Sequence, residues 1–431
     1  RTGGYSMALA SDAPKDVFRL SMLIYDTRFR AITIQVVVLI LVLLGVAWLL
    51  NNTIENLAAK DKDISFAFLW ARAGYDIDQQ LIPYTNDSTH FRALLVGLLN
   101  TLVVAFLGCI VATVIGVFAG VLRLSNNWLV SRMMTVYVEI FRNIPLLLWI
   151  TIVFVILSEL RPQPKDFRVT DEMIAAGQAP KATMALFDSV AITNRGSNIP
   201  APLAARPLGS VEIAGIPFNL TFWAGLAVVA VSIWANVLLR RRARAVQEAT
   251  GVRPVIWGQS LLILAGPFLA YVWAVGLHLE YPVLKGFNFQ GGIAIAHSFT
   301  ALLIAISLYT GAFIAEAVRA GVLAISRGQT EAAYALGLRP RRTISLIVLP
   351  QALRVIVPPL ISQYLNLTKN TTLGMAISYL DLKGTLGGIT LNQTGRELEC
   401  MLLLMLIYLI LSLIISSLMN AFNAAVKLKE R

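Results

Sequence analysis

The amino-acid sequence predicts an all-α integral membrane protein with about eight transmembrane helices, and three observations lead to this fold class. Of the 431 residues, 57% are hydrophobic and only 14% are charged, and the mean hydropathy is +0.70. This composition excludes an ordinary soluble domain, which needs a far more polar surface. The apolar residues gather into runs long enough to cross a bilayer, and the basic residues alternate between the connecting loops.

Each predicted transmembrane helix is a run of roughly 20 mostly apolar residues. The runs lie at about 32–50, 93–122, 129–157, 220–239, 255–278, 294–322, 344–368 and 400–422. The third, fourth and seventh contain polar residues or prolines, so their limits are the least well defined. Small residues within the runs predict close helix packing, as at Gly108, Gly116, Gly120 and Gly311.

Basic residues in the loops provide an independent test of this count, because short cytoplasmic loops are enriched in Lys and Arg. If the N-terminal leader is cytoplasmic, the next cytoplasmic segments are 123–128, 240–254, 323–343 and 423–431. Their basic residues are Arg123, Arg240, Arg241, Arg242, Arg244, Arg253, Arg327, Arg339, Arg341, Arg342, Lys427, Lys429 and Arg431. The alternate segments are mostly longer and more dilute in basic residues. The alternation therefore predicts a multi-pass protein with both termini in the cytoplasm.

Several functional classes lack the residues that they need. The net charge of +12 is spread over short loops rather than one basic face, so we do not expect nucleic-acid binding. Cys109 and Cys400 lie in separate apolar runs, which argues against a disulfide or a metal site. The three histidines are scattered, and the Gly-Lys dipeptide of a P-loop does not occur. We therefore predict no catalytic residue, no metal site and no cofactor in this chain, which is not an enzyme.

The stretch EAAYALGLRPRRTISLIVLPQ, at 331–351, falls in a predicted cytoplasmic segment. Ser326 and Gln329 have the spacing of a capping box, which predicts a helix that starts just before Thr330. Glu331 is then expected near the first turn, where a negative charge suits the helix dipole. Gly337 is placed to end the helix in the left-handed conformation, with a hydrophobic residue after it.

Pro340 prevents this helix from continuing and can open a second one. The Ala and Gly residues of 331–337 would let a partner backbone approach closely. On composition alone, a helix that seats in a partner protein and a plain loop with an incidental helical turn are equally supported.

EAAYALGL followed by IVLP resembles the EAA loop of ABC-importer permeases, and the matching positions are Glu331, Ala332, Ala333, Gly337, Ile347, Leu349 and Pro350. In that family the loop forms the coupling helix, which sits in a cleft of the ATP-hydrolysing subunit. Further stretches resemble the branch that serves polar amino acids, namely FRNIPLLL at 141–148, YTGAFIAEAVRAG at 309–321, RGQTEAAYALGL at 327–338, LPQALRVIVPPL at 349–360 and LTKNTTL at 367–373. The resemblance covers about 91–158 and 291–426.

The resemblance implies a type I ABC-importer permease core with an extra N-terminal helix and a two-helix insertion, similar to one subunit of the general L-amino-acid importers. We expect the cytoplasmic leader, first helix and periplasmic loop at 1–92, and the first part of the core at 93–158. The periplasmic loop and insertion follow at 159–293, and the second part of the core, with its coupling loop at 325–343, occupies 294–426. The Pro-rich stretch 159–219 shows no strong helix or strand signal. It is either a docking surface or a tether, and a tether is favoured.

The resemblance also implies partners and a location in the bacterial inner membrane. These partners are a homologous permease subunit in a heterodimer, two ATP-binding subunits that hold ATP and Mg, and a periplasmic binding protein that delivers the L-amino acid. The residues expected to contact the ATPase subunit are Glu331, Ala332, Ala333, Gly337 and Arg341. The alternative is an ATP-independent secondary carrier or channel for small polar solutes, whose arginine-rich loop only sets topology.

Charged residues inside the predicted spans are candidates for the translocation path, because they are costly in lipid. Glu139 and Arg142 lie three residues apart, and Glu316 and Arg319 repeat that spacing. Either pair forms an ion pair between helices, which is favoured, or one arginine meets a substrate carboxylate. Arg142 stands just before Asn143-Ile144-Pro145, where proline frees backbone groups from helical bonding.

The seventh span contains Pro358 and Pro359, which we expect to interrupt its helix. Lys369, Asn370 and Thr371 follow that break. Irregular polar backbone at membrane depth is tolerated where it lines a cavity, as at many transport sites. These three residues therefore either border the translocation path or simply end the helix at the periplasmic surface, and the two interpretations are equally supported.

Overall fold

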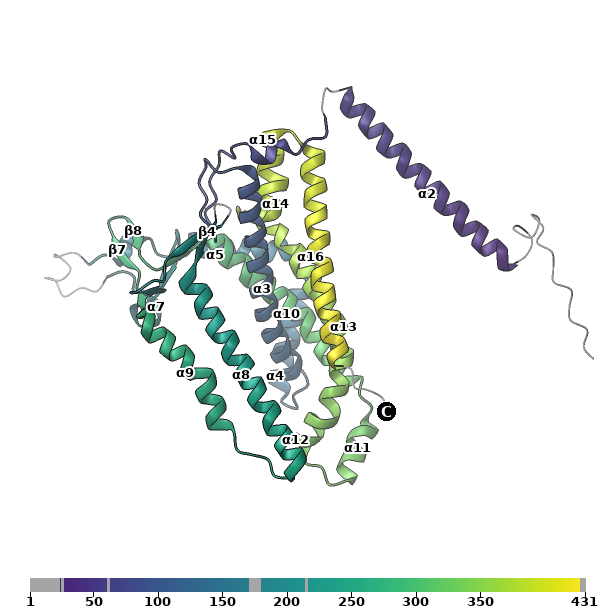
Figure 1. Ribbon diagram of the computed structural model, residues 1–431, viewed down its shortest axis with the longest axis vertical. Coiled ribbons are helices and arrows are strands. Elements are labelled where there is room, and N and C mark those ends of the chain that lie inside the picture. The colour runs from purple at the N-terminus through teal and green to yellow at the C-terminus, as the bar shows by residue number, and fades with distance from the viewer. Residues whose placement is uncertain (1–23, 25–26, 60–62, 170–179, 214–215, 427–431) are drawn as a thin grey trace, which may run out of the picture. The chain divides into compact units, whose positions relative to one another are not determined.

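The computed structural model describes residues 24, 27–59, 63–169, 180–213 and 216–426. The chain divides into two compact units, Arg1–Phe66 and Ala67–Arg431. Helices account for most of the described residues, which confirms the predicted helical fold class. Short strands, all in the second unit, are the only sheet structure in the described ranges (Figure 1).

The first unit contains one long apolar helix, α2 (Thr27–Ala58). At 1.5 Å per residue, its 32 residues extend about 48 Å, which exceeds the roughly 30 Å hydrocarbon core of a bilayer. Its large apolar side chains, such as Leu41 and Trp48, are exposed within this unit. A helix that is apolar on all sides is expected to have lipid as its solvent. The predicted span at 32–50 is thus confirmed and extended at both ends.

The core of the second unit is built from long helices. These are α3 (His90–Leu122), α10 (His297–Leu323), α13 (Leu349–Asn370) and α16 (Glu397–Val426). α10 packs along α3 and also contacts α13, while α16 packs on α13. The predicted spans at 93–122, 294–322 and 400–422 are confirmed, each within a few residues.

Glycines allow α3 and α10 to approach closely, as the small residues of the sequence predicted. A Cβ atom added to Gly116 of α3 would lie 2.5 Å from Cβ of Ile314 in α10. No real side chain tolerates such a distance, so this contact requires glycine. Neighbouring helices lie against all four of the glycines named above, Gly108, Gly116, Gly120 and Gly311.

The third predicted span, at 129–157, is two helices rather than one. α4 (Trp128–Asn143) and α5 (Leu146–Glu159) are bent by 106° relative to each other. Ile144 is extended, and Pro145 lacks the N–H that would continue the helical bonding pattern. Seven helices in the described ranges are long and apolar enough to cross a membrane, and the total is eight if this bent pair counts as one span.

The seventh predicted span, at 344–368, corresponds to a longer helical stretch that runs from Pro340 to Ile377. It consists of α12 (Pro340–Thr343), the π-helical turn η3 (Ile344–Val348), α13 and the 3₁₀ turn η4 (Thr371–Ile377). The expected interruption at Pro358 and Pro359 is wrong, because α13 continues through both. Packing against neighbouring helices lets membrane helices tolerate proline, and α13 contacts α3, α10 and α16.

The two-helix insertion forms a hairpin of α8 (Leu220–Thr250) and α9 (Trp257–Val275). The two helices pack mainly on each other and on nearby strands. One link between them is the hydrogen bond from Ser260 Oγ to Asn236 Oδ1, at 2.7 Å. α8 is longer than the predicted span 220–239 and carries the basic run that follows it.

Four small antiparallel sheets accompany the hairpin. Five of their strands lie within 159–219, where we expected no strand. The strands are β1 (Ala191–Thr193), β2 (Gly196–Ile199), β3 (Ala201–Ala204), β4 (Ser210–Ile213), β5 (Ile216–Asn219), β6 (Leu277–Glu280), β7 (Val283–Lys285), β8 (Asn288–Gln290) and β9 (Ile293–Ile295). The pairings are β1-β2-β9, β3-β6, β4-β5 and β7-β8. Strands of three or four residues are too short for a visible alternation. Pro202 and Pro217 lie in two-stranded sheets, where every strand is an edge that tolerates proline.

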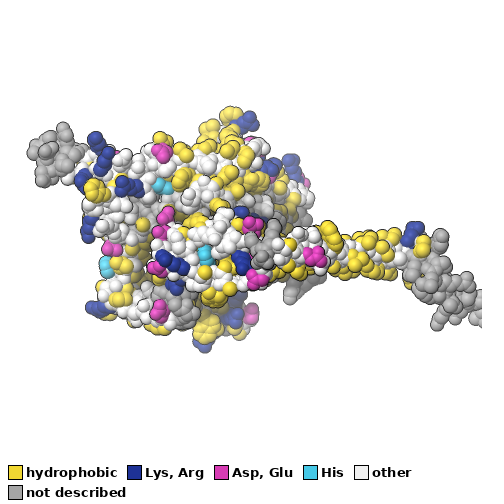
Figure 2. Space-filling view, turned by 90° about the horizontal axis from the view of Figure 1, so that it is seen from above, with side chains coloured by type: hydrophobic (Ala, Val, Ile, Leu, Met, Phe, Trp, Pro, Cys, Tyr) yellow, Lys and Arg dark blue, Asp and Glu magenta, His cyan; other side chains and the backbone are white. Residues whose placement is uncertain are grey.

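The two ends of the second unit differ in character (Figure 1). The sheets lie at one end, the sheet end, together with α14 (Leu382–Gly384), η5 (Thr385–Thr390) and α15 (Leu391–Thr394). Acidic, basic and histidine side chains are interspersed on that face (Figure 2). The α8–α9 turn, α12 and α11 (Arg327–Ala335) lie at the opposite, basic end. The remaining short elements are η1 (Ala67–Trp70), η2 (Pro164–Phe167) and α7 (Ala185–Asp188).

Candidate functional site

The short helix α11 occupies the place where the sequence predicted one, at the basic end of the second unit (Figure 1). It begins at Arg327, three residues before Thr330. Ser326 is the residue at its N-cap, but within the described chain its side chain makes no capping hydrogen bond, so the predicted capping box is wrong. Because of the earlier start, Glu331 lies in the second turn rather than near the first. The helix dipole therefore gives little reason for an acid at this position.

The C-terminal end of α11 follows the prediction closely. Gly337 has φ +73°, and its N–H donates to the carbonyl of Tyr334 at 2.9 Å. The N–H of Leu338 donates to the carbonyl of Ala333 at 3.1 Å. These two bonds form the Schellman arrangement, which needs a left-handed residue between the helix and its continuation. A Cβ atom on Gly337 would meet nothing within 4 Å, so within this chain glycine is needed for its backbone conformation.

The side chains around this turn divide into a buried and an exposed set. Ala333 is only 1% exposed and packs against its own chain, so its side chain is not open to a partner as the sequence suggested. The other expected contact residues, Glu331, Ala332, Gly337 and Arg341, are exposed. Two large apolar side chains that sequence reasoning missed are exposed beside them, Tyr334 at 51% and Leu336 at 81%. The sequence could have indicated them, because a tyrosine and a leucine beside the glycine of a loop are unusual where the loop contacts only water.

A charge cluster joins the ends of three helices near the basic end, and it consists of Arg123, Arg142, Glu316 and Arg319. Glu316 of α10 accepts hydrogen bonds from Arg319 at 2.7 Å and from Arg123, which caps α3, at 2.5 Å. Arg142 of α4 lies 3.8 Å from the same carboxylate. The Arg123 side chain is only 8% exposed, whereas those of Arg142 and Arg319 are 34% exposed.

Three arginines around one carboxylate leave the cluster with a net charge of about +2. Arg142 also lies over the ring of Phe313, 5.3 Å from its centroid, which provides some cation–π attraction. The cluster can therefore hold α3, α4 and α10 together and still present positive charge to an anion.

The two predicted ion pairs have different outcomes. The pair of Glu316 and Arg319 is formed. Glu139 and Arg142 form no ion pair in the described residues, because Arg142 faces Glu316 while Glu139 is exposed and accepts from Asn143 at 3.3 Å. A spacing of three residues brings two side chains to one face, but the neighbouring helix decides which partner is met. Arg123 was predicted only to set topology.

Lys369, Asn370 and Thr371 lie where α13 passes into η4, toward the sheet end. They are not brought together with the charge cluster. Thr371 is fully buried and donates to the carbonyl of Thr368 at 2.9 Å. Lys369 is exposed and lines a cavity of about 360 Å³ together with Thr372, Lys383, Met401, Leu404, Met405 and Tyr408. The three residues therefore face different surroundings.

Asp381 is a buried acid that the sequence reading did not single out. Its Oδ1 accepts from the N–H of Gly384 at 2.8 Å, and Thr371 Oγ1 and Tyr408 OH each lie 3.4 Å from Oδ2. Burial raises the pKa of this carboxyl group to about 6. Next to it, the N–H of Leu382 donates to Thr101 of α3 at 3.0 Å. Asp381 therefore stabilises the turn that attaches the segment after η4 to the core.

A bundle of apolar helices, an exposed short helix at its basic end and buried charged groups between its helices together define a polytopic membrane protein. The chain belongs to the family of binding-protein-dependent transport system inner membrane components, whose family model matches residues 112–428.

Three relatives illustrate the range of similarity. The chain is 67% identical over 426 residues to the glutamate/glutamine/aspartate/asparagine transport system permease protein BztB of Rhodobacter capsulatus, with 99% of this chain and 100% of that protein covered. It is 40% identical to the general L-amino acid transport system permease protein AapQ of Rhizobium johnstonii, with 96% of each covered. It is 31% identical over 184 residues to the BztC permease protein of Rhodobacter capsulatus, which covers 42% of this chain and 40% of that protein.

Proposed function

We propose that this chain is a permease subunit of an ATP-driven ABC importer for L-amino acids. The observation that carries the coupling part is α11, a short helix that ends at left-handed Gly337 beside exposed Tyr334 and Leu336. A surface of this kind suits insertion into a partner protein, because a few anchors, tyrosine among them, carry most of the binding energy of protein interfaces. The named substrates of the relatives support glutamate, glutamine, aspartate and asparagine, or a wider set of L-amino acids.

In this proposal two ATPase subunits, which bind ATP and Mg²⁺, hold the exposed face of α11. Glu331, Ala332, Gly337 and Arg341 lie on or beside that face, and Ala333 supports it from within. Closure of the ATPase pair on ATP moves α11, and the attached helices then alternate the path between the two sides of the membrane. The ATP chemistry belongs to the partners.

The basic end is the cytoplasmic end in this proposal, by the enrichment of Arg in cytoplasmic loops. The C-terminus, which follows α16, and the N-terminus would then both be cytoplasmic. A periplasmic binding protein would deliver the amino acid at the sheet end. Similarity of this chain to both BztB and BztC of one organism supports a pair of homologous permeases, hence a heterodimer.

The translocation path has two candidate regions. Arg142 and Arg319 are partly exposed cations of the charge cluster, which can meet a substrate carboxylate, and Glu316 and Asn143 lie beside them. Lys369, Asn370 and Thr371 form the second region, toward the sheet end, where exposed Lys369 lines a cavity. The buried position of Thr371 favours a supporting role for that residue.

The test is purification in mild detergent of the chain expressed from its native operon, with mass spectrometry of what co-purifies. We expect a P-loop ATPase and a second permease. Gly337→Val should lose the ATPase, because a β-branched residue is strained at φ +73°. Gly337→Asn is the matched control, since Asn tolerates the left-handed conformation and should retain more of the partner.

Two results would contradict the proposal. A chain that purifies alone, with uptake that follows an ion gradient, would favour the secondary carrier. Normal ATPase capture and normal uptake by Gly337→Val would remove the coupling role of α11.

A further inference from the structure

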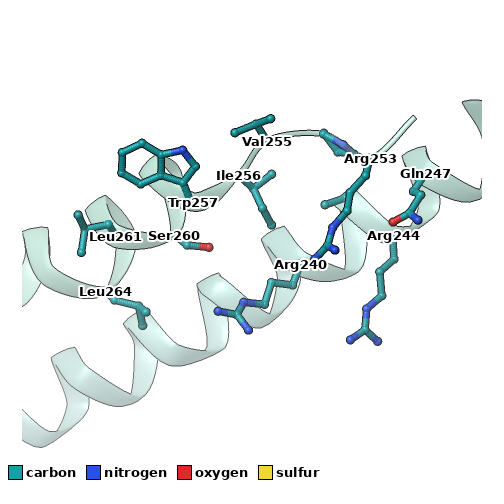
Figure 3. Close-up of a pocket in the computed structure, with 12 residues that line it drawn as sticks. Arg240, Arg244, Gln247, Arg253, Val255, Ile256, Trp257, Ser260, Leu261 and Leu264 are labelled. Atoms are coloured by element: carbon teal, nitrogen blue, oxygen red, sulfur yellow. The ribbon is translucent and has the colours of Figure 1, made fainter. Parts of the chain in front are cut away.

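A cavity of about 840 Å³ lies at the basic end of the α8–α9 hairpin and is lined by residues of α8, α9 and the loop between them (Figure 3). We call it the arginine pocket. One side is formed by Arg240 and Arg244 on the last turns of α8, and Arg253 reaches toward them from the loop (Figure 3). The other side is formed by the first turns of α9, with Leu261 and Leu264.

The three arginines, Arg240, Arg244 and Arg253, form no ion pair within the described parts of the chain, and no Asp or Glu lines the pocket. Arg240 and Arg244 are one helical turn apart on α8, so both guanidinium groups lie on one face. Three cations that line one cavity with no acid in its lining favour an external anion, and guanidinium groups bind phosphate in two-pronged geometry.

The position of the pocket along the hairpin matches the boundary of a bilayer. The 20 residues of α8 from 220 to 239 rise about 30 Å, which is the thickness of the hydrocarbon core. Arg240 then lies at the edge of the hydrocarbon, and Arg244 lies about 6 Å farther out, within the headgroup layer. Trp257, the first residue of α9, is 73% exposed at the same level, as interfacial tryptophans are.

The wall below the arginines is apolar and open. Leu261 is 60% exposed and Leu264 is 38% exposed. An apolar wall does not stabilise a hydrated, soluble anion, whereas it can pack against the acyl chain of a lipid. The pocket thus has a cationic upper part and an apolar lower part, in the order that a phospholipid presents its phosphate and its acyl chains.

We propose that the arginine pocket binds an anionic phospholipid of the leaflet at the basic end, with its phosphate held by Arg240, Arg244 and Arg253 and an acyl chain along Leu261 and Leu264. The bound lipid fixes the depth of the hairpin, which packs mainly on itself and on the small sheets. This proposal depends on the hairpin crossing the membrane and not on the identity of the transported substrate.

The test is native mass spectrometry of the full chain released from micelles that contain phosphatidylglycerol and phosphatidylcholine in equal amounts. We expect one phosphatidylglycerol to be retained in preference to phosphatidylcholine. Arg240→Ala/Arg244→Ala should weaken this binding roughly thirtyfold, since each arginine near a membrane surface contributes about fivefold. Arg241→Ala/Arg242→Ala is the matched control, because it removes the same charge from neighbouring positions that do not line the pocket.

Each other outcome overturns the proposal. Equal losses in the two double variants would mean diffuse surface attraction without a pocket. Displacement of the lipid by glycerol 3-phosphate or inorganic phosphate would mean a site for a soluble phosphate group. Unchanged lipid retention, combined with lost capture of an ATPase subunit by Arg240→Ala/Arg244→Ala in phosphatidylcholine nanodiscs, would make the arginines a protein contact.

Discussion

Replacing Glu316 with Gln is the sharpest test of the charge cluster. The substitution keeps the size of the side chain and removes the one carboxylate that, among the described residues, forms ion pairs with Arg123, Arg142 and Arg319. Three like charges then remain together between α3, α4 and α10. We expect these helix ends to loosen, because the cations repel one another and Arg123 has lost its partner.

The magnitude follows from the burial of each pair. Arg123 is 8% exposed, and breaking a buried ion pair by removing one partner costs roughly 3–5 kcal/mol. Arg142 and Arg319 are each 34% exposed, so the ion pair of each with Glu316 contributes at most about 1 kcal/mol to the free energy of unfolding. The Gln carbonyl still accepts one hydrogen bond, which offsets about 1 kcal/mol. Because the Glu316 side chain is itself 26% exposed, the lower end of the buried-pair cost applies, and we expect Glu316→Gln to lower the free energy of unfolding by about 3 kcal/mol.

Thermal unfolding of the purified chain in detergent measures this effect, with a fall in Tm of roughly 4 °C for a unit of this size. Arg319→Gln is the control, since the loss of a partly exposed partner should cost less than about 1 kcal/mol. The double variant Arg123→Gln/Glu316→Gln should recover part of the loss, because the uncompensated buried cation is gone. An unchanged Tm for Glu316→Gln, or strictly additive effects in the double variant, would refute the reasoning.

Three further predictions concern separate parts of the chain. Burial raises the folded-state pKa of Asp381 from 3.8 to about 6, so the folded protein binds this proton more tightly than the unfolded chain. Its contribution to stability is therefore fully present below the unfolded pKa of 3.8 and is lost as the pH rises to and through about 6, a fall of up to about 3 kcal/mol. Asp381→Asn should remove that fall, and a wild-type minus variant Tm difference that is the same at pH 5 and pH 8 would contradict this. Gly116→Ala should cost roughly 1–3 kcal/mol, because the new Cβ would lie 2.5 Å from Ile314. Gly45→Ala, where nothing lies within 4 Å, should not destabilise, and equal Tm values for these two variants would show that α10 yields. Asn370→Leu should lower amino-acid uptake while assembly stays intact, and unchanged uptake kinetics would count against a place for this residue in the path.

The length of the apolar runs in the sequence was enough to predict most of the helical architecture. Membrane helices must satisfy all their backbone groups internally, so an apolar run of sufficient length leaves little choice of structure. Prolines were harder to interpret. We interpreted the prolines at both places as interruptions of helical bonding. Pro145 follows the end of α4, whereas α13 continues through Pro358 and Pro359. The difference is tertiary, since α13 is packed on several helices, and a single sequence does not carry that information.

The candidate site shows the same limit at the level of side chains. The left-handed conformation of Gly337 is a local property, and the sequence predicted it. The partner of Arg142 and the burial of Asp381 both depend on helices far away in the chain. The spacing of residues within one helix therefore predicted the wrong partner for Arg142 and did not indicate that Asp381 is buried. The strands β1–β9 were missed because each is only three or four residues long.

The helical stretch Pro340–Ile377 connects the two regions that matter most for the proposed function. At 1.5 Å per residue its 38 residues extend about 57 Å, from the turn after α11 to the segment that Asp381 stabilises. Under the proposed function, we expect a displacement of α11 to reach α13 through this continuous helical stretch. The π turn η3 ends two residues before Pro350, and we expect any bending of the stretch to occur there. We therefore expect coupling to depend on the stiffness of α13, which continues as a helix through Pro358 and Pro359.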